Sequence, residues 1–316
     1  MTNDELKQYY CGALFFEESA DGYLQAFQYS KAQMEYFKGA FDFWYDRCMA
    51  TTAKTIEFAT AATEVSFDFK FAWRGSEDSF ELWIDGLAVE IAYVHDLAEA
   101  GSIRWTMPAG AKQVVIYLPA DATVLVKNFT VNGDVAPVKK GKKVLWLGDS
   151  ITQGYGPLRS AHTYVSVANR LLKYDIINQG IGGYIYDKKS LMKMDGYQPE
   201  MLIVALGTNQ YGMKDMTMVE EYYETLMGIY GTEIPVLVIS PIWRGDHPEE
   251  YDVFLHFCEE VKRIAGKYPN VRIIDGLTLV PHRSEYYIDN LHPNCLGTEE
   301  YGRNLVEAMR NGGFGA

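Results

Sequence analysis

The chain has 316 residues, of which 48% are hydrophobic and 14% aromatic, enough apolar side chain for a folded protein of two ordinary domains. Its formal net charge of −13 argues against nucleic acid or an anionic membrane as a partner, because binding to phosphate groups needs a basic surface. The four cysteines show no C-x-x-C spacing, so neither a zinc site nor a disulfide framework is expected.

The sequence contains no recognisable targeting or membrane segment. The N-terminus lacks a basic stretch followed by an apolar one, and no later run approaches the roughly 18 apolar residues of a membrane span. We therefore expect a cytoplasmic protein with reduced thiols.

The first part of the chain predicts an antiparallel β-sandwich of jelly-roll type. In residues 66–73, four aromatic residues alternate with other residues, which is the period-two pattern of a half-buried strand. Further short strands are predicted over 80–84, 87–94, 102–107, 113–118 and 123–131. Asp85-Gly86 is a hairpin signal, and no convincing helix separates these strands. The aromatic segment Met34–Cys48 has no clean period and stays undecided between a strand and irregular cover.

Pro137 and the basic cluster Lys139–Lys143 mark the predicted boundary between two domains. We interpret the cluster as a solvated linker rather than a binding patch. The predicted domains are a sandwich accessory domain over 1–138 and a catalytic domain over 139–316.

Beyond the linker, apolar runs alternate with amphipathic helical patterns. The runs lie at 144–147, 175–177, 201–206, 235–239 and 271–274. Thr217 and Glu220 predict a capping box at the start of one of the helices between them. Buried strands joined by helices predict a five-stranded parallel sheet in a three-layer α/β/α domain.

Polar or glycine-rich segments follow several of these strands. They are Gly148-Asp149-Ser150, Asn178–Gly183, Gly207-Thr208-Asn209 and, further on, Asp289–His292. Because the carboxyl ends of parallel strands share one rim, we expect these groups to converge there.

A converged set of this kind suits acyl transfer through a serine. The Ser150 hydroxyl needs a base, which His292 can supply, and Asp289 can orient the imidazole. The amides of Ser150 and Gly183 and the side chain of Asn209 can stabilise an oxyanion. Such a reaction needs neither a metal nor another cofactor, and acidic residues and histidines do not cluster at metal-ligand spacing.

Each residue also has a structural alternative. Ser150 can cap a helix, the glycines can serve loop geometry and Asn209 can cap a turn. The ordered set, rather than any single member, favours catalysis.

These segments resemble the blocks of the SGNH hydrolases, the GDSL esterase/lipase superfamily. The resemblance implies Ser150 as nucleophile, Gly183 and Asn209 as oxyanion donors, and Asp289 and His292 as acid and base. The family's third block usually continues to an aspartate, where this chain has Gln210. That difference puts the rigidity of the active-site loops in doubt.

A sandwich ahead of such a domain resembles the two-domain bacterial carbohydrate esterases, which remove acetyl groups from poly- or oligosaccharides. We therefore predict an oligosaccharide or small-molecule ester as substrate, with Trp243 as a stacking platform and Arg244 as a polar clamp. A packed tryptophan and a surface arginine remain the equal alternative. Two other functions stay open: a lipid or thioester acylhydrolase, and a carbohydrate-binding protein with a decayed esterase site. The oligomeric state is not predicted.

Overall fold

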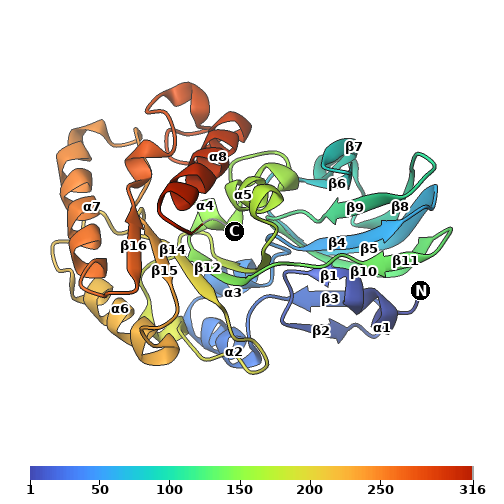
Figure 1. The fold of residues 1–316 in the computed structure, drawn as a ribbon, viewed down its shortest axis with the longest axis horizontal. Helices are drawn as coiled ribbons and strands as arrows, with labels where there is room; N and C mark the ends of the chain where they lie inside the picture. The colour runs from blue at the N-terminus through green and yellow to red at the C-terminus, as the bar shows by residue number, and fades with distance from the viewer. Residues whose placement is uncertain (315–316) are drawn as a thin grey trace.

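The computed structural model describes residues 1–314, which form an antiparallel sandwich packed against a three-layer α/β/α unit (Figure 1). The antiparallel strands lie on the right of Figure 1, and the parallel sheet with its covering helices lies on the left. The predicted fold class is confirmed.

Two antiparallel sheets make up the N-terminal sandwich. The first has the order β1-β4-β9-β6-β7, with β11 paired to β4, and the second has the order β2-β3-β10-β5-β8. Apolar side chains of both sheets, such as Phe67 and Val114, form one core between them. The strands are β1 (Tyr10–Cys11), β2 (Phe15–Glu18), β3 (Leu24–Phe27), β4 (Thr55–Thr60), β5 (Glu64–Arg74), β6 (Ser79–Ile84), β7 (Leu87–Tyr93), β8 (Ala100–Thr106), β9 (Lys112–Tyr117), β10 (Ala122–Val131) and β11 (Val135–Pro137).

The hairpin predicted at Asp85-Gly86 joins β6 to β7. Both residues have positive φ angles, 50° and 84°, as a two-residue type I′ turn requires. All the strands predicted between residues 66 and 131 are present within a few residues of their expected bounds. The short strands β1 to β4 and β11 were not predicted, because most of them are too brief to show a period.

The segment 31–48 is helical, so both expectations for Met34–Cys48 were wrong. Besides the short α1 (Asn3–Leu6), the chain forms α2 (Lys31–Ala40) and α3 (Asp42–Cys48). Helix α2 begins at a capping box in which Ser30 and Gln33 exchange backbone and side-chain hydrogen bonds. Its side chains Met34 and Phe37 are buried against the parallel sheet, not in the sandwich. Figure 1 shows both helices beside that sheet, below β12.

The parallel sheet has the strand order β13-β12-β14-β15-β16, and every neighbouring pair is parallel. In this doubly wound order the first two strands are exchanged, so the sheet has its topological switch point at β12. The strands are β12 (Lys143–Gly148), β13 (Asp175–Gly180), β14 (Met201–Ala205), β15 (Val236–Ile239) and β16 (Val271–Ile274).

Helices cover both faces of this sheet. One face packs on α5 and α8, and the other packs on α6, α7 and the N-terminal α2. Helix α2, which precedes the linker, therefore forms part of one helical layer of the α/β/α unit. The helices of this region are α4 (Ser150–Gln153), α5 (Tyr164–Leu172), α6 (Thr217–Tyr230), α7 (Tyr251–Ala265) and α8 (Cys295–Asn311).

The capping box predicted at Thr217 and Glu220 is wrong. Thr217 is already the first residue of α6, and the carboxylate of Asp215 accepts hydrogen bonds from its backbone amide and its hydroxyl at 2.9 and 2.5 Å. Glu220 instead pairs with Lys267 at 2.9 Å. The carboxylate of Asp215, two residues before Thr217, is therefore the acceptor at the start of α6 that the threonine was expected to be.

Buried polar contacts join the sandwich to the α/β/α unit. Glu81, which is fully buried in β6, pairs with Arg159 and accepts a hydrogen bond from the Ala161 amide. Glu57 in β4 pairs with Lys140 of the linker at 2.6 Å. Because a buried charge is costly without its partner, these pairs fix how the two parts dock.

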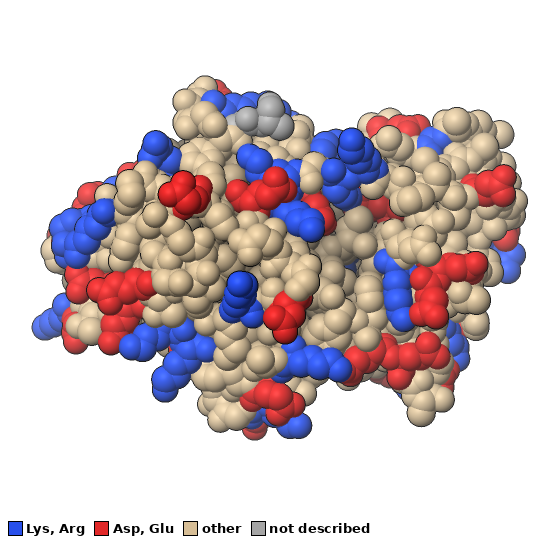
Figure 2. Space-filling view, turned by 60° about the horizontal axis from the view of Figure 1, so that its bottom comes forward, with Lys and Arg blue, Asp and Glu red and all other residues tan. Residues whose placement is uncertain are grey.

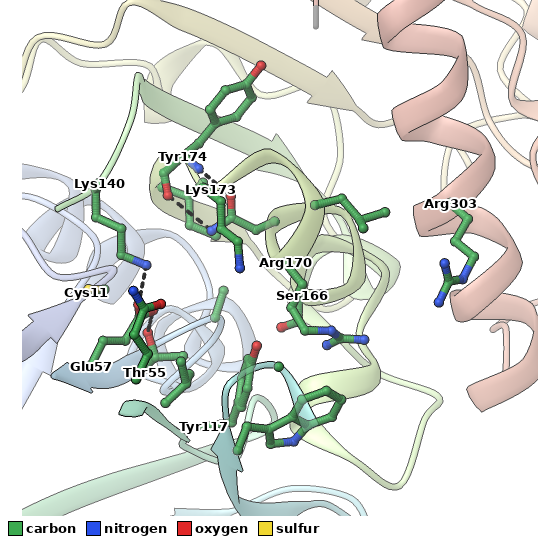
Figure 3. A pocket seen from close by; sticks show the side chains of 18 residues that line it. Cys11, Thr55, Glu57, Tyr117, Lys140, Ser166, Arg170, Lys173, Tyr174 and Arg303 are labelled. Atoms are coloured by element: carbon green, nitrogen blue, oxygen red, sulfur yellow. Dashed lines mark hydrogen bonds and ion pairs between the residues drawn. The ribbon is translucent and has the colours of Figure 1, made fainter. Parts of the chain in front are cut away.

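A cavity of about 290 Å³ lies between the two parts (Figure 3). Tyr117 and the Glu57–Lys140 pair line it from one side, and Arg170 and Lys173 line it from the other. Lys140 and Lys173 precede β12 and β13, so the cavity lies toward the amino ends of these strands. Ser150, which follows β12, is not among its lining residues.

Truncation of Phe37 tests whether the N-terminal helices are part of the main core. Phe37 is fully buried among side chains of the α/β/α unit, so Phe37→Ala is expected to lower the free energy of unfolding by about 3–5 kcal/mol. Val253, which is 49% exposed on α7, provides the control, and Val253→Ala should cost less than about 1 kcal/mol. Denaturant unfolding followed by circular dichroism measures both. Equal, small losses would contradict this packing.

Candidate active site

The segment after β12 turns sharply into the short helix α4. Asp149 is the N-cap, and its carboxylate accepts a hydrogen bond from the Ile151 amide at 3.1 Å. Gly148 cannot carry a side chain, since a Cβ there would lie 2.1 Å from the Thr152 hydroxyl. This turn makes Ser150 the first residue of α4, where its amide has no partner within the helix.

Ser150 lies within hydrogen-bond distance of His292, 142 residues further along the chain. Its Oγ is 2.9 Å from His292 Nε2, and His292 Nδ1 is 2.7 Å from Asp289 Oδ2. Ser150 is 7% exposed, and the side chain of His292 is 15% exposed. The structure thus places the three predicted triad residues in the order hydroxyl, imidazole, carboxylate.

The backbone around Asp289 holds both its own carboxylate and the histidine in place. Asp289 Oδ1 accepts hydrogen bonds from the amides of Leu291 and His292, at 3.0 and 2.7 Å. Asn290 between them has a φ of 60°, a left-handed conformation that asparagine tolerates. One tight turn therefore presents the imidazole and the carboxylate together.

Two opposing effects act on the pKa of Asp289. Partial burial works to raise it, while hydrogen bonds from the His292 amide and ring, the charge of His292 and the Leu291 amide together hold it below its usual value. The carboxylate is therefore ionised in the neutral range, as a group that orients an imidazole must be.

The loop after α4 packs against the imidazole. The edge of the Tyr155 ring meets the His292 ring at a centroid distance of 4.6 Å and an angle of 75°. A Cβ on Gly156 would lie 2.3 Å from the Pro293 carbonyl oxygen, so only glycine fits there. These contacts restrict the orientation of His292 toward Ser150.

The two further predicted oxyanion residues lie on neighbouring loops. Gly183 has a φ of 67°, and its amide donates to no acceptor within residues 1–314. The Asn209 side-chain amide donates to the Tyr184 carbonyl at 2.8 Å, which uses one of its two N–H bonds. Asn209, on the loop after β14, therefore also holds the loop after β13 in place.

Gln210 joins the same two loops through an uncharged contact. It is 5% exposed, and its Oε1 accepts a hydrogen bond from the Tyr186 amide at 2.6 Å. The Tyr186 hydroxyl in turn donates to the Leu206 carbonyl at 3.0 Å. The glutamine thus supplies a brace between these loops without a carboxylate.

A hydrogen-bonded chain links the sandwich to the loop after β13, here called the oxyanion loop because it carries Gly183, a predicted oxyanion donor. Gln153 at the end of α4 donates from Nε2 to Asp121 Oδ1 of the β9–β10 loop at 2.6 Å. Its Oε1 accepts from the Gly182 amide, also at 2.6 Å. Both side chains are buried, with exposures of 1% and 4%. A residue of the sandwich therefore helps to fix the backbone next to Gly183.

Trp243 and Arg244 lie on the loop after β15, as expected, but both are engaged by protein groups. Arg244 is 7% exposed, forms a two-pronged pair with Asp246 at 2.8 and 2.6 Å, and donates to the Thr208 carbonyl at 2.6 Å. Trp243 stacks on His282 with an interplanar angle of 15°. Arg244 in this structure holds the loop that carries Asn209, and the substrate-binding role stays a prediction for both residues.

Comparisons with known proteins agree with this architecture. The profile of the GDSL-like Lipase/Acylhydrolase family matches residues 146–299, which include Ser150, Gly183, Asn209, Asp289 and His292. Residues 146–299 therefore carry a GDSL-like lipase/acylhydrolase domain. The protein is therefore a carboxylic ester hydrolase.

Solved structures similar to the whole chain share its fold at low sequence identity. A salicylyl-acyltransferase from a tetracycline biosynthetic pathway has a TM-score of 0.74 at 15% identity, covering 96% of this chain and 94% of its own. A GDSL-like lipase candidate from Bacteroides ovatus gives 0.75 at 15% identity, with the same coverage. A family two carbohydrate esterase from Cellvibrio japonicus gives 0.65 at 16% identity, covering 97% of this chain and 96% of its own. No curated protein matches the sequence significantly.

The surface around the GDSL-like domain is of mixed charge. Acidic and basic side chains are interspersed over the face drawn in Figure 2, without a large area of one sign. No helix within residues 1–314 is long and apolar enough to cross a bilayer. The same residues contain no group of three or more His, Cys, Asp or Glu side chains placed to hold a metal ion.

Sequence analysis missed the contribution of the sandwich to this site. Gln153 follows the recognised segment Gly148-Asp149-Ser150 and had no predicted role, and Asp121 gave no signal at all. Neither spacing nor periodicity could show that a loop between two predicted strands reaches α4.

The carboxyl group next to the serine provides a test of the turn. Burial raises the pKa of Asp149 to about 7. The folded protein therefore binds a proton between about pH 4 and pH 7 that the unfolded chain has already lost. The free energy of unfolding should fall as the pH rises through this range, and it should level off above it with respect to this group.

Asp149→Asn removes this titration while its carbonyl oxygen can still cap α4. We expect the variant to show a smaller decline in unfolding free energy between pH 5 and pH 7 than the original protein, in denaturant titrations at each pH. Parallel curves for the two proteins would show that the Asp149 carboxyl does not hold a proton in the folded state.

Proposed function

We propose that the enzyme hydrolyses acetyl esters on carbohydrate through an acyl-serine intermediate, with Ser150 as the nucleophile. The observation that carries this proposal is the pair of contacts at His292, 2.9 Å from the Ser150 hydroxyl and 2.7 Å from Asp289. A serine with a base in hydrogen-bond reach, itself oriented by a carboxylate, is the arrangement that activates a hydroxyl for acyl transfer.

In the first half of the reaction, Ser150 Oγ attacks the ester carbonyl carbon while His292 Nε2 takes the hydroxyl proton. Asp289 stabilises the imidazolium that forms and keeps its Nδ1 hydrogen directed at the carboxylate. His292 then gives the proton to the alcohol oxygen as the C–O bond of the ester breaks. The alcohol leaves, and the acyl group stays on Ser150.

In the second half, water takes the place of the alcohol. His292 removes a proton from the water as its oxygen attacks the acyl carbon, and it returns the proton to Ser150 Oγ when the acyl–serine bond breaks. The products are the carboxylic acid and the free enzyme.

The oxyanion formed in each half needs donors that are already in position. The amides of Ser150 and Gly183 have no acceptor within residues 1–314, and Asn209 keeps one side-chain N–H bond after its contact with Tyr184. Each such donor contributes about 3–4 kcal/mol to the lowering of the barrier.

Two observations support a carbohydrate ester as the substrate. The fold of the whole chain, sandwich included, is shared with an enzyme described as a family two carbohydrate esterase. The sandwich also contacts the catalytic loops through Asp121, so it lies close enough to influence what binds there. A lipid or thioester acylhydrolase is the alternative, and acyl-chain preference separates the two.

Removal of the nucleophile tests the catalytic assignment. Ser150→Ala should lower kcat for p-nitrophenyl acetate by at least about 10³-fold, because the hydroxyl that forms the acyl-enzyme is lost. The side chain is small, so thermal unfolding should change little. Wild-type rates in a folded Ser150→Ala protein would exclude Ser150 as the nucleophile.

Acyl-chain preference tests the substrate class. Across p-nitrophenyl esters from acetate to laurate, kcat/KM should be highest for acetate. A kcat/KM that increases toward laurate would contradict the acetylesterase proposal and favour a lipid acylhydrolase. The assignment of the triad would not be affected.

The chain from Asp121 through Gln153 to Gly182 should matter for rate more than for binding. Asp121→Ala removes the acceptor that positions Gln153, and the shifted Gly183 amide should lower kcat for p-nitrophenyl acetate by about 10-fold or more with KM nearly unchanged. Asp121→Asn keeps an acceptor oxygen and should retain most of the rate.

Asp134, an exposed carboxylate elsewhere in the sandwich, is the matched control, and Asp134→Ala should behave as wild type. An Asp121→Ala enzyme with unchanged kcat would show that the sandwich braces the fold but not the oxyanion loop.

A further inference from the structure

Helix α3 places an aromatic and cationic cluster beside the oxyanion loop. The cluster consists of Phe43 and Arg47, one turn apart on α3, and Trp73 at the end of β5. The Arg47 guanidinium lies over the Phe43 ring at 3.9 Å and over the Trp73 ring at 4.5 Å from the ring centroids. The triad and oxyanion residues described above do not include any of these side chains.

The cluster lies beside the loop that carries Gly183. A Cβ on Gly182 would lie 3.5 Å from Arg47 Cγ and 3.6 Å from the Phe43 ring, and a Cβ on Gly183 would lie 3.6 Å from the same ring. A side chain at either glycine would thus be in van der Waals contact with the cluster, which lies beside this loop. An ester whose carbonyl oxygen faces the Gly183 amide would therefore bind close to α3.

Arg47 has its aromatic contacts but no anionic partner. Its side chain forms no ion pair and no hydrogen bond within residues 1–314, although the chain has 42 acidic residues and Asp42 and Asp46 lie on the same helix. By contrast, Arg159, Arg244 and Arg263 are each paired with a carboxylate. A half-buried guanidinium next to a reaction site, without a partner, is an unusual feature in so acidic a protein.

Stacking leaves the guanidinium suited to one kind of ligand. The two rings lie against the guanidinium and hold it in place, while its N–H groups point outward along its edges in a planar fork. That fork matches the two oxygens of a carboxylate. Phe43, 40% exposed, and Phe41, 54% exposed, add apolar surface on which a sugar or aromatic ring can lie.

We propose that Arg47, held by Phe43 and Trp73, binds a carboxylate of the substrate, and that the enzyme acts on acidic esters such as acetylated uronic acid sugars. This inference rests on the proposed esterase function and adds the charge of the substrate to it. The carboxylate can stand on the alcohol side or on the acyl side of the ester, and the experiment separates these two cases.

The experiment compares acidic esters with neutral esters of the same shape. On the alcohol side the pair is 4-acetoxybenzoate and 4-acetoxybenzamide, and on the acyl side it is the p-nitrophenyl monoester of succinic acid and that of succinamic acid. For each pair, the ratio of kcat/KM for the acidic ester to that for the neutral ester is measured in wild type, Arg47→Met and Arg47→Lys.

Arg47→Met keeps an unbranched apolar stem but loses the charge and the fork. The acidic-to-neutral ratio should fall at least 10-fold in one of the two pairs, since a charge-assisted bidentate contact is lost, while the neutral ester changes little. Arg47→Lys keeps the charge without the fork and should give an intermediate ratio. Arg104, exposed on β8, is the control, and Arg104→Met should leave both ratios unchanged.

A second measurement compares two inhibitors in the wild-type protein and in Arg47→Met. Benzoate should inhibit the hydrolysis of p-nitrophenyl acetate competitively and benzamide should not, and Arg47→Met should lose the difference. The carbohydrate form of the test is acetate release from O-acetylated galacturonate oligomers against O-acetylated xylo-oligosaccharides, with the former preferred by wild type.

The possible failures are distinct. Ratios that fall less than 10-fold in both pairs, or equal inhibition by benzoate and benzamide, would overturn the role of Arg47 while the esterase stands. If Ser150→Ala leaves the hydrolysis of the neutral esters unchanged, the proposed function itself fails.

Discussion

The site depends on the hydrogen-bonded chain from Asp121 through Gln153 to Gly182. Gln153 lies three residues after Ser150 on α4, so one buried side chain connects the serine turn, the oxyanion loop and the sandwich. Its two contacts, both 2.6 Å long, are made where water is excluded, so a lost partner would leave a buried polar group unsatisfied. This cost favours a single arrangement of the three segments.

The topology of the sheet explains why such a chain is needed. Strand β12 lies at the switch point, with β13 on one side and β14 on the other, so the loops after these three strands open onto one rim. The rim brings the loops together but does not fix their conformations. Asn209 and Gln210 connect the loop after β13 to the loop after β14. Arg244 connects the loop after β14 to the loop after β15, and Asp121 of the sandwich binds Gln153. Loops held on several sides can keep the proposed oxyanion donors in position before a substrate arrives.

The sandwich packs directly against the enzyme domain and is not merely connected to it by the linker. Helices α2 and α3 leave the antiparallel sheets, α2 packs on a face of the parallel sheet, and α3 lies against Gly182. Buried pairs such as Glu81 with Arg159 add direction to that packing. Removal of the first 138 residues would therefore expose the core around Leu147 and Ile177, so point substitutions are the sharper tools here.

Much of the fold could be predicted from the sequence because its signals are local. The parallel strands are continuous apolar runs, the helices between them carry regular stripes, and the β6–β7 turn needs two residues that accept positive φ. The polar segments at the strand ends could be placed on one rim for the same reason. The segment 31–48 could not be predicted, since its apolar face packs on the parallel sheet, whose first strand begins only at Lys143.

The roles of Gln153 and Arg47 depend on contacts between distant segments. Gln153 forms hydrogen bonds with Asp121, 32 residues earlier in the chain, and with Gly182, 29 residues later. Arg47 matters only because its side chain, without a carboxylate partner in the described part of the chain, lies beside Gly182. Spacing along a single sequence carries no information about either.

Covalent labelling of the nucleophile tests the central claim most directly. A fluorophosphonate reacts with a serine only when a neighbouring base activates it, and peptide mass spectrometry locates the adduct. We expect one adduct per chain, on the peptide that contains Ser150, and its loss in a folded His292→Ala protein. An adduct on another residue, or labelling of Ser150 that persists without His292, would contradict the account.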